Sequence, residues 1–178
     1  WLFRMMGHDS IAVLDGGLPK WIADGKPLDT GAPIIRDRHM TVQPRPNMVR
    51  DVTQVARAAK LRDHEIIDAR AAARFRGDAP EPRQGLRAGH IPSSKNLPFT
   101  QVLNGDHTMK TTDELSEEFC KAGVDLSKPA ITTCGSGVTA AVLSLALERI
   151  GKTDHALYDG SWTEWGQFPT LNIATGDS

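Results

Sequence analysis

A cysteine at the head of a glycine-rich loop is the strongest chemical signal in the sequence. The run Cys134-Gly-Ser-Gly-Val-Thr-Ala140 follows an apolar strand pattern at 130–133 and leads directly into a helical pattern. Gly135 and Gly137 allow such a loop to curl tightly, with several backbone N–H groups aimed inward. Because inward amides and the positive end of the following helix both favour thiolate over thiol, Cys134 is predicted to ionise readily and to act as a nucleophile.

The chain has a second cysteine, Cys120, which lacks such a loop. It stands beside Phe119 in an amphipathic helical pattern, so it is predicted to be an ordinary buried core residue, the commonest fate of a free cysteine. The same fate would make Cys134 inert, but the order of strand, Cys-Gly-x-Gly and helix argues against it. Two cysteines are too few for a secreted disulfide scaffold, so we expect free thiols, a reducing compartment and a cytoplasmic location.

A dense group of arginines follows another strand pattern, Glu65–Asp68. The guanidinium group binds carboxylates and oxyanions through two parallel hydrogen bonds, which a lysine cannot do. The group therefore predicts an anion pocket, although about half of its members are expected to be solvated or to pair with nearby acids. The arginines are Arg70, Arg74, Arg76, Arg83 and Arg87, and the nearby acids are Asp68, Asp78 and Glu81.

Strand and helix patterns alternate in the part of the chain that holds these residues. Helical spacing of apolar residues predicts helices over 51–60, 114–122 and 138–150. Thr111 and Glu114 form a capping box before the second of these helices, and Gly123 is its stop signal. Short apolar runs predict strands over 65–68, 130–133 and 156–158.

This alternation predicts an α/β fold, with a mostly parallel central sheet flanked by helices on both faces. In open sheets of this kind, ligands bind outside the carboxyl ends of the strands. Cys134 directly follows one predicted strand, and the arginine group follows another. We therefore expect the nucleophile and the anion pocket at the same edge of the sheet.

The chain also contains an internal repeat. Residues 7–21 align without a gap to residues 151–165, at a constant offset of 144 positions. Each copy reads as a glycine after a helix, a short apolar strand, an Asp-Gly turn and a helix start that closes on tryptophan. The identical pairs are Gly7/Gly151, Ala12/Ala156, Asp15/Asp159, Gly16/Gly160 and Trp21/Trp165. The alternative is chance similarity between two strand-turn-helix segments, because short Asp-Gly turns are common.

The repeat predicts the domain organisation. The second copy lies near the end of a domain, so we expect residues 1–26 to be the C-terminal remnant of an earlier domain whose body lies upstream of Trp1. Residues 27–47 contain four prolines and no periodic pattern, which is typical of an interdomain linker. Residues 48–178 are then the complete, catalytic domain.

Length and composition set the protein class. The 178 residues are 39% hydrophobic and 24% charged, with a mean hydropathy of -0.34, which is typical of a globular protein. The formal net charge of -1 offers no attraction to nucleic acid or to anionic lipid. The sequence has no apolar run of about 18 residues, so we expect neither nucleic acid nor a membrane as a partner.

Seven segments resemble the rhodanese superfamily in type and order. They are Asp68-Ala-Arg70, Arg74-Phe-Arg-Gly77, Pro80-Glu-Pro-Arg83, Gly89-His-Ile-Pro92, Asn96-Leu-Pro-Phe99, Cys134-Gly-Ser-Gly-Val-Thr-Ala140 and Tyr158-Asp-Gly-Ser-Trp162. Over residues 48–168 the chain resembles the catalytic C-terminal domain of the two-domain 3-mercaptopyruvate sulfurtransferases. Its opening segment resembles the end of the inactive N-terminal domain of that family. The cysteine loop is the specific part of the resemblance.

The resemblance implies a persulfide relay without a metal or an organic cofactor. Cys134 would take the sulfur of 3-mercaptopyruvate, release pyruvate, and pass the sulfur to cyanide or to a thiol such as thioredoxin or a small thiol. By motif position, Arg74 and Arg83 would bind the substrate carboxylate. Ser136 would hydrogen-bond or relay a proton, together with His and Asp residues of the N-terminal domain. The loop residues that would cradle the sulfur are Gly135, Gly137, Val138 and Thr139.

Three other functions fit the sequence less well. Thiosulfate-specific members of the family carry basic side chains after the cysteine, whereas Gly135 and Ser136 are neutral and suit a monoanionic α-keto acid. A related phosphatase needs an arginine six positions after the cysteine, where this chain has Ala140. A silent, binding-only rhodanese module usually lacks the cysteine, but loss of the first domain would produce the same silence.

Overall fold

The computed structural model describes residues 1–177 and contains one five-stranded sheet in which every strand pair is parallel. The strand order is β1-β5-β4-β2-β3, so neighbours in the sheet are joined by crossovers. The strands are β1 (Val49–Arg50), β2 (Glu65–Asp68), β3 (Lys95–Asn96), β4 (Ala130–Thr133) and β5 (His155–Tyr158). The fold is therefore α/β, as the sequence predicts.

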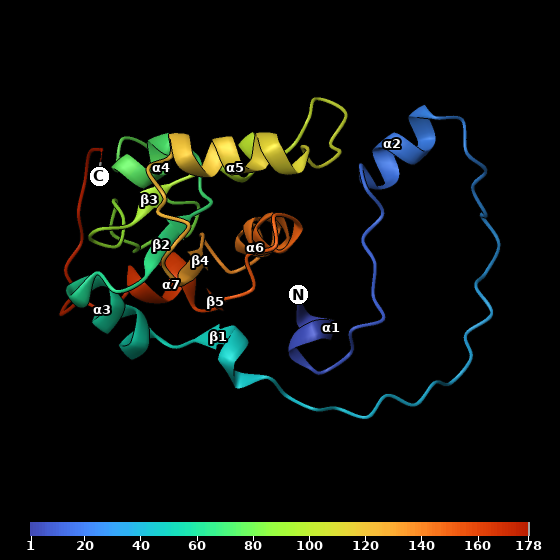
Figure 1. Cartoon of the computed structure of the whole chain (residues 1–178), viewed down its shortest axis with the longest axis horizontal. Coiled ribbons are helices and arrows are strands. Elements are labelled where there is room, and N and C mark those ends of the chain that lie inside the picture. Colours follow the sequence, from blue (N-terminus) through green and yellow to red (C-terminus); the bar gives the residue numbers. More distant parts are fainter. Residues whose placement is uncertain (178) are drawn as a thin grey trace.

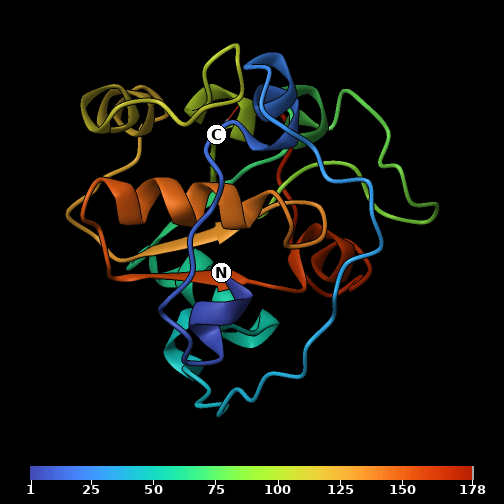
Figure 2. The same ribbon diagram turned by 90° about the vertical axis from the view of Figure 1, so that its right-hand side faces the viewer.

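Helices cover both faces of this sheet and bury a separate apolar cluster on each. One cluster packs α5 and α6 against residues such as Ile67 and Leu157, and the other packs α3 and α7 against Ile66 and Ile131. Figure 2 shows α6 above the strands and α3 below them. The helices are α3 (Val52–Leu61), α4 (Ala72–Arg76), α5 (Thr112–Lys121), α6 (Ala140–Arg149) and α7 (Ser161–Trp165), with 3-10 turns η1 (Pro46–Met48) and η2 (Phe99–Val102).

The predicted elements form close to their expected positions. Strands 65–68 and 130–133 have the predicted bounds, and the strand predicted at 156–158 begins at His155. The three predicted helices differ from α3, α5 and α6 by one or two residues at each end. Thr111 and Glu114 form the predicted capping box, and Gly123 follows the end of α5 with φ +75°. Local signals therefore fix these boundaries.

The expectation for Cys120 was wrong. Its side chain is exposed on α5, whereas the neighbouring Phe119 is fully buried. The buried stripe of α5 consists of Leu115 and Phe119, four positions apart, and Cys120 points about 100° away from Phe119, outside that stripe. Cys120 is an accessible thiol and not a core residue.

Residues 1–48 lie outside the sheet. They contain α1 (Leu2–Met5) and α2 (Gly17–Ala23), and a long irregular segment follows α2 and returns to β1 around the outside of the molecule (Figure 1). The strand expected before the first Asp-Gly turn is absent, because residues 8–14 have no neighbouring strand with which to pair. Polar contacts hold this segment: Arg4 pairs with Glu148 at 3.1 Å, and Asp15 accepts a hydrogen bond from the Met109 amide at 2.8 Å.

No helix within residues 1–177 is both long and apolar enough to cross a bilayer. In the same part of the chain, no three His, Cys, Asp or Glu side chains gather in a way that could hold a metal ion.

Candidate active site

A pocket of about 240 Å³ opens at the carboxyl edge of the sheet, where β4 passes through its loop into α6. This is the edge at which ligands bind in open α/β sheets. The pocket is lined by residues from the loop after β4, from α4 and the segment after it, and from α7. They are Arg74, Glu81, Pro82, Arg83, Leu86, Cys134, Gly135, Ser136, Val138, Thr139 and Thr163.

Cys134 lies at the base of this pocket, directly after β4. Its residue is only 2% exposed, so the thiol is screened from bulk water but borders the cavity. The turn after β5 holds its backbone on both sides: the Cys134 amide donates to Ser161 Oγ at 3.2 Å, and its carbonyl accepts from the Trp162 amide at 2.9 Å. Two strands that neighbour each other in the sheet thus fix the position of the sulfur.

The loop after Cys134 presents unpaired backbone amides. Within residues 1–177, none of the amides of Gly135 to Thr139 has a hydrogen-bond acceptor. Gly137 adopts φ +82°, and a Cβ there would lie 3.1 Å from the carbonyl oxygen of Asp159, so only glycine fits this bend. Unpaired amides beside a buried sulfur and before the start of α6 are suited to bind negative charge.

The arginine group divides into pocket residues and structural residues. Arg70 is fully buried, where it pairs with Asp68 at 2.7 Å and Glu81 at 2.8 Å and lies 4.4 Å from the ring centre of Trp162. Arg76 pairs at the surface with Asp78, and Arg87 donates to backbone carbonyls near the C-terminus, including that of Phe168. These three arginines therefore have partners within the protein and do not line the pocket, as expected for about half of the group.

Arg74 and Arg83 line the pocket, and each is held there by a neighbour. The guanidinium of Arg74 pairs with the buried carboxylate of Glu81 at 2.5 Å, and a Cβ on Gly135 would lie 3.0 Å from its Nη2 atom. Arg83 Nη1 donates to Thr163 Oγ1 at 2.8 Å. The pocket thus combines a cysteine thiol, unpaired amides and two guanidinium groups.

The site residues predicted from the sequence come together with one qualification. Cys134, Gly135, Val138 and Thr139 line the pocket with Arg74 and Arg83, and Ser136 also lines it from an exposed position. Gly137 is buried and does not line the pocket, and its part is to shape the loop.

Three residues that support the site were not singled out by the sequence analysis as part of it. Ser161 and Thr163 hold the backbone of Cys134 and Gly135, and Glu81 holds Arg74 and Arg70. A signal for the first two was available, because the second Asp-Gly turn follows the predicted strand 156–158 and ligands bind where the strands of such sheets end. Ser161 also has an unusual φ of +51°, which the sequence does not reveal.

Tyr158, at the end of β5, is a poor candidate for proton transfer. Burial, with the Glu164 carboxylate nearby, raises the pKa of its hydroxyl far above the ordinary value, so the phenol stays protonated. Its carbonyl accepts from Ser161 Oγ at 2.8 Å. Its contribution to the site is therefore made through the backbone.

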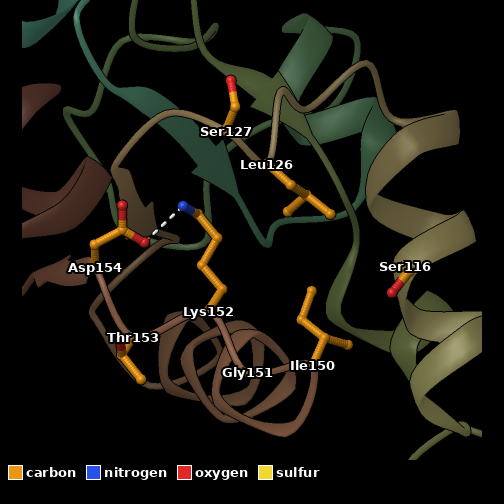
Figure 3. Close-up of a pocket in the computed structure, with 8 residues that line it drawn as sticks. All are labelled: Ser116, Leu126, Ser127, Ile150, Gly151, Lys152, Thr153 and Asp154. Atoms are coloured by element: carbon orange, nitrogen blue, oxygen red, sulfur yellow. Dashed lines mark hydrogen bonds and ion pairs between the residues drawn. The ribbon is translucent and has the colours of Figure 1, made fainter.

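A second groove, of about 440 Å³, lies at the amino ends of β4 and β5, opposite Cys134. Figure 3 shows Lys152 reaching across it to Asp154, at a distance of 2.6 Å. Lys152 is the one cationic side chain that lines this groove, and it is already paired with Asp154. No cysteine or histidine lines the groove. It is lined by Ser116, Leu126, Ser127, Ile150, Gly151, Lys152, Thr153 and Asp154.

Comparisons with known proteins agree with this geometry. Over its full length the chain is 40% identical to thiosulfate/3-mercaptopyruvate sulfurtransferase 1, mitochondrial, of Arabidopsis thaliana, and covers 52% of that protein. It is 43% identical to 3-mercaptopyruvate sulfurtransferase of Escherichia coli, with 97% of the chain and 61% of the relative covered. The chain therefore spans between half and two thirds of the length of these relatives.

A solved structure and a family model complete the comparison. The crystal structure of SseA from Escherichia coli, a 3-mercaptopyruvate sulfotransferase, superposes with a TM-score of 0.80 and 40% identity, covering 91% of this chain and 60% of the other. The model of the rhodanese-like domain matches residues 51–168, which include every residue that lines the pocket. The chain thus belongs to the rhodanese family.

Proposed function

We propose that residues 48–178 form the catalytic domain of a 3-mercaptopyruvate sulfurtransferase. The observation that carries this proposal is the shared pocket, in which Cys134 lies among unpaired loop amides and two guanidinium groups. Relatives named for this activity support it. A pocket of this size accommodates a small anionic donor and not a polymer.

The proposed chemistry uses Cys134 as the nucleophile. Its thiolate attacks the sulfur of 3-mercaptopyruvate, an S–S bond forms, and the C–S bond breaks. The electron pair of that bond passes to carbon as the enolate of pyruvate, which takes up the proton of the donor thiol. Cys134 is left as a persulfide, and the charge on its outer sulfur is stabilised by the amides of Gly135 to Thr139.

The second half-reaction returns Cys134 to its starting state. An acceptor thiolate attacks the outer sulfur, takes it as a persulfide and releases the Cys134 thiolate. We propose thioredoxin or a small thiol as acceptor, with cyanide as an alternative, and no cofactor enters either step. Ser136 lines the pocket beside Cys134 and is our proposed proton relay.

The pocket favours an α-keto acid as donor. In this proposal Arg74 and Arg83 bind the carboxylate of 3-mercaptopyruvate through paired hydrogen bonds. The loop itself adds no positive side chain, because Gly135 and Ser136 follow the cysteine. Thiosulfate, a dianion, is the second candidate donor, and the name of the Arabidopsis relative includes both compounds.

We also propose the domain boundaries and a reducing location. Residues 1–26 correspond to the end of a first rhodanese unit and 27–47 to a linker, on the basis of the repeat and the irregular, exposed path of the linker. Two cysteines without a disulfide are consistent with a reducing compartment such as the cytoplasm, although one relative is named as mitochondrial.

Intact-mass measurement tests the function directly. The chain is incubated briefly with 3-mercaptopyruvate or with thiosulfate, and the gain of one sulfur atom is recorded before and after addition of a thiol. We expect 3-mercaptopyruvate to add one removable sulfur to the wild type and to Cys120→Ser, and none to Cys134→Ser.

The other outcomes have distinct meanings. A gain from thiosulfate alone would replace the proposed donor by the second candidate. A folded wild-type chain that gains sulfur from neither donor would overturn the proposed activity for this chain and favour a binding module.

A further inference from the structure

Thr163 in α7 joins one of the pocket arginines to the cysteine loop. Its hydroxyl accepts a hydrogen bond from Arg83 Nη1 at 2.8 Å and donates one to the Gly135 carbonyl at 2.5 Å. Its backbone amide donates to the same Gly135 carbonyl at 2.9 Å. A single residue therefore contacts the guanidinium above the pocket and the loop that follows the nucleophile.

The direction of these bonds is fixed by chemistry. A guanidinium group can only donate hydrogen bonds, so the Thr163 hydroxyl must accept from Arg83 and donate its own proton to the Gly135 carbonyl. Because the C=O and the following N–H of a trans peptide point in opposite directions, this contact also turns the amide of Ser136 away from α7. The hydrogen bonds from Arg83 to Thr163 and from Thr163 to Gly135 thus fix the orientation of both the Arg83 side chain and the Ser136 amide.

Arg83 depends on this contact more than Arg74 does. Arg74 is paired with the buried carboxylate of Glu81, whereas Arg83 is exposed, and within residues 1–177 Thr163 supplies its one side-chain hydrogen bond. A long exposed side chain without a partner samples many rotamers, and ordering it costs free energy whenever an anion binds. A pre-formed hydrogen bond lowers that cost.

We propose that Thr163 is a positioning residue that holds Arg83 in the orientation that binds the carboxylate of the sulfur donor. This inference rests on the proposed function for the identity of the donor, but the geometry applies to any small carboxylate that approaches Cys134. The neighbouring backbone contact from the Thr163 amide survives any side-chain replacement. Loss of the hydroxyl therefore releases Arg83, while the Gly135 carbonyl keeps one of the two hydrogen bonds that it accepts from Thr163.

The test compares two alkylating reagents at Cys134, in a Cys120→Ser background that leaves one cysteine. Iodoacetate carries a carboxylate and iodoacetamide is its neutral analogue, so the ratio of their rates measures anion steering by the pocket. We expect Thr163→Val to lower the iodoacetate-to-iodoacetamide ratio about tenfold, as Arg83→Ala does, because a hydrogen bond to a charged group is lost. Thr163→Ser keeps the hydroxyl and should retain the wild-type ratio.

Combination of the two changes separates positioning from general damage. Addition of Thr163→Val to Arg83→Ala should lower the ratio no further, since both remove the same interaction. General damage to the loop would slow the reaction of Cys134 with both reagents equally and would leave the ratio of the two rates unchanged. If Thr163→Val folds poorly, Thr163→Ala is measured in its place. An unchanged ratio in both variants, or additive losses in the double variant, would overturn the proposal.

Turnover then connects this result to the proposed activity. With 3-mercaptopyruvate, Thr163→Val should raise KM about tenfold with little change in kcat, because carboxylate binding is lost equally from ground and transition states. The alkylation test addresses the role of Thr163 and the turnover test addresses the proposed function, so either can fail without the other. A wild type that shows carboxylate steering but forms no persulfide would contradict the proposed function and leave the role of Thr163 intact.

Discussion

Two segments that align in sequence, residues 7–21 (the first copy) and 151–165 (the second copy), have different structures in this molecule. In the second copy, β5 lies between β1 and β4, and the turn that follows holds the backbone of Cys134. In the first copy, residues 8–14 form no strand, although the Asp-Gly turn and the helix after it are present. The same local signals therefore produce the turn and the helix in both places, but the strand in one place.

The difference shows which elements depend on neighbours. A helix satisfies its backbone within its own segment, whereas a strand needs partners on at least one side. The aligned tryptophans differ in the same way: Trp165 is 2% exposed in an apolar cluster, whereas Trp21 is only partly buried and contacts the Pro27 carbonyl. Burial in the second copy is a property of the sheet around it.

The largest expected effect comes from a charge placed at the aligned alanines. Ala156 is 1% exposed in the middle of β5, so Ala156→Asp buries an unpaired carboxylate and should cost several kcal/mol, enough to leave much of the protein unfolded. Ala12 is exposed, and Ala12→Asp should change stability by less than about 0.5 kcal/mol. Urea unfolding measures the loss in free energy of unfolding for both variants. Equal losses would contradict the structural difference between the two copies.

A smaller contrast is expected at the aligned tryptophans. Trp165→Ala removes a buried ring and its hydrogen bond to the Asn172 carbonyl, and should cost about 3–5 kcal/mol. Trp21→Ala should cost about 1 kcal/mol or less, since its ring leaves no cavity in a packed core. Thermal unfolding followed by circular dichroism compares the two variants, and a large loss for Trp21→Ala would show that the first copy is packed more tightly than its exposure indicates.

The smallest expected effect is a dependence of stability on pH. His155, which begins β5 and aligns with Ile11, has its pKa lowered by burial, against the opposing charge of Glu148 at 3.3 Å. A histidine whose pKa is lowered in the folded state contributes stability that is present above about pH 6.5 and is lost as the pH falls through the folded pKa. The free energy of unfolding should therefore decrease from about pH 7.5 to about pH 5.

A matched variant assigns this dependence. His155→Gln removes the titrating group, so its loss of stability over the same pH interval should be smaller than that of the wild type. His90, also buried and with its pKa lowered mainly by burial, supplies the part that remains. If the free energy of unfolding of His155→Gln depends on pH as strongly as that of the wild type, His155 is not the cause of the dependence.

Several features were predictable because their signals are local. The short strand patterns at β2 and β4, the capping box at Thr111 and the stop at Gly123 each depend on residues within a few positions. The short strands β1 and β3 were not predicted, because two residues carry no periodicity. Cys120 was placed in the core because a helical pattern gives the type of element more reliably than the facing of each residue.

The sequence by itself determined the residue types of the candidate site: a cysteine on a glycine-rich loop after a buried strand, with arginines after another. The tertiary structure decided which groups lie beside that cysteine. Arg74 and Arg83 reach the pocket while Arg70 is fully buried, and Thr163 contacts both the loop and Arg83. The physical reason is that parallel strands bring together residues from distant parts of the chain, and only the assembled sheet fixes their distances.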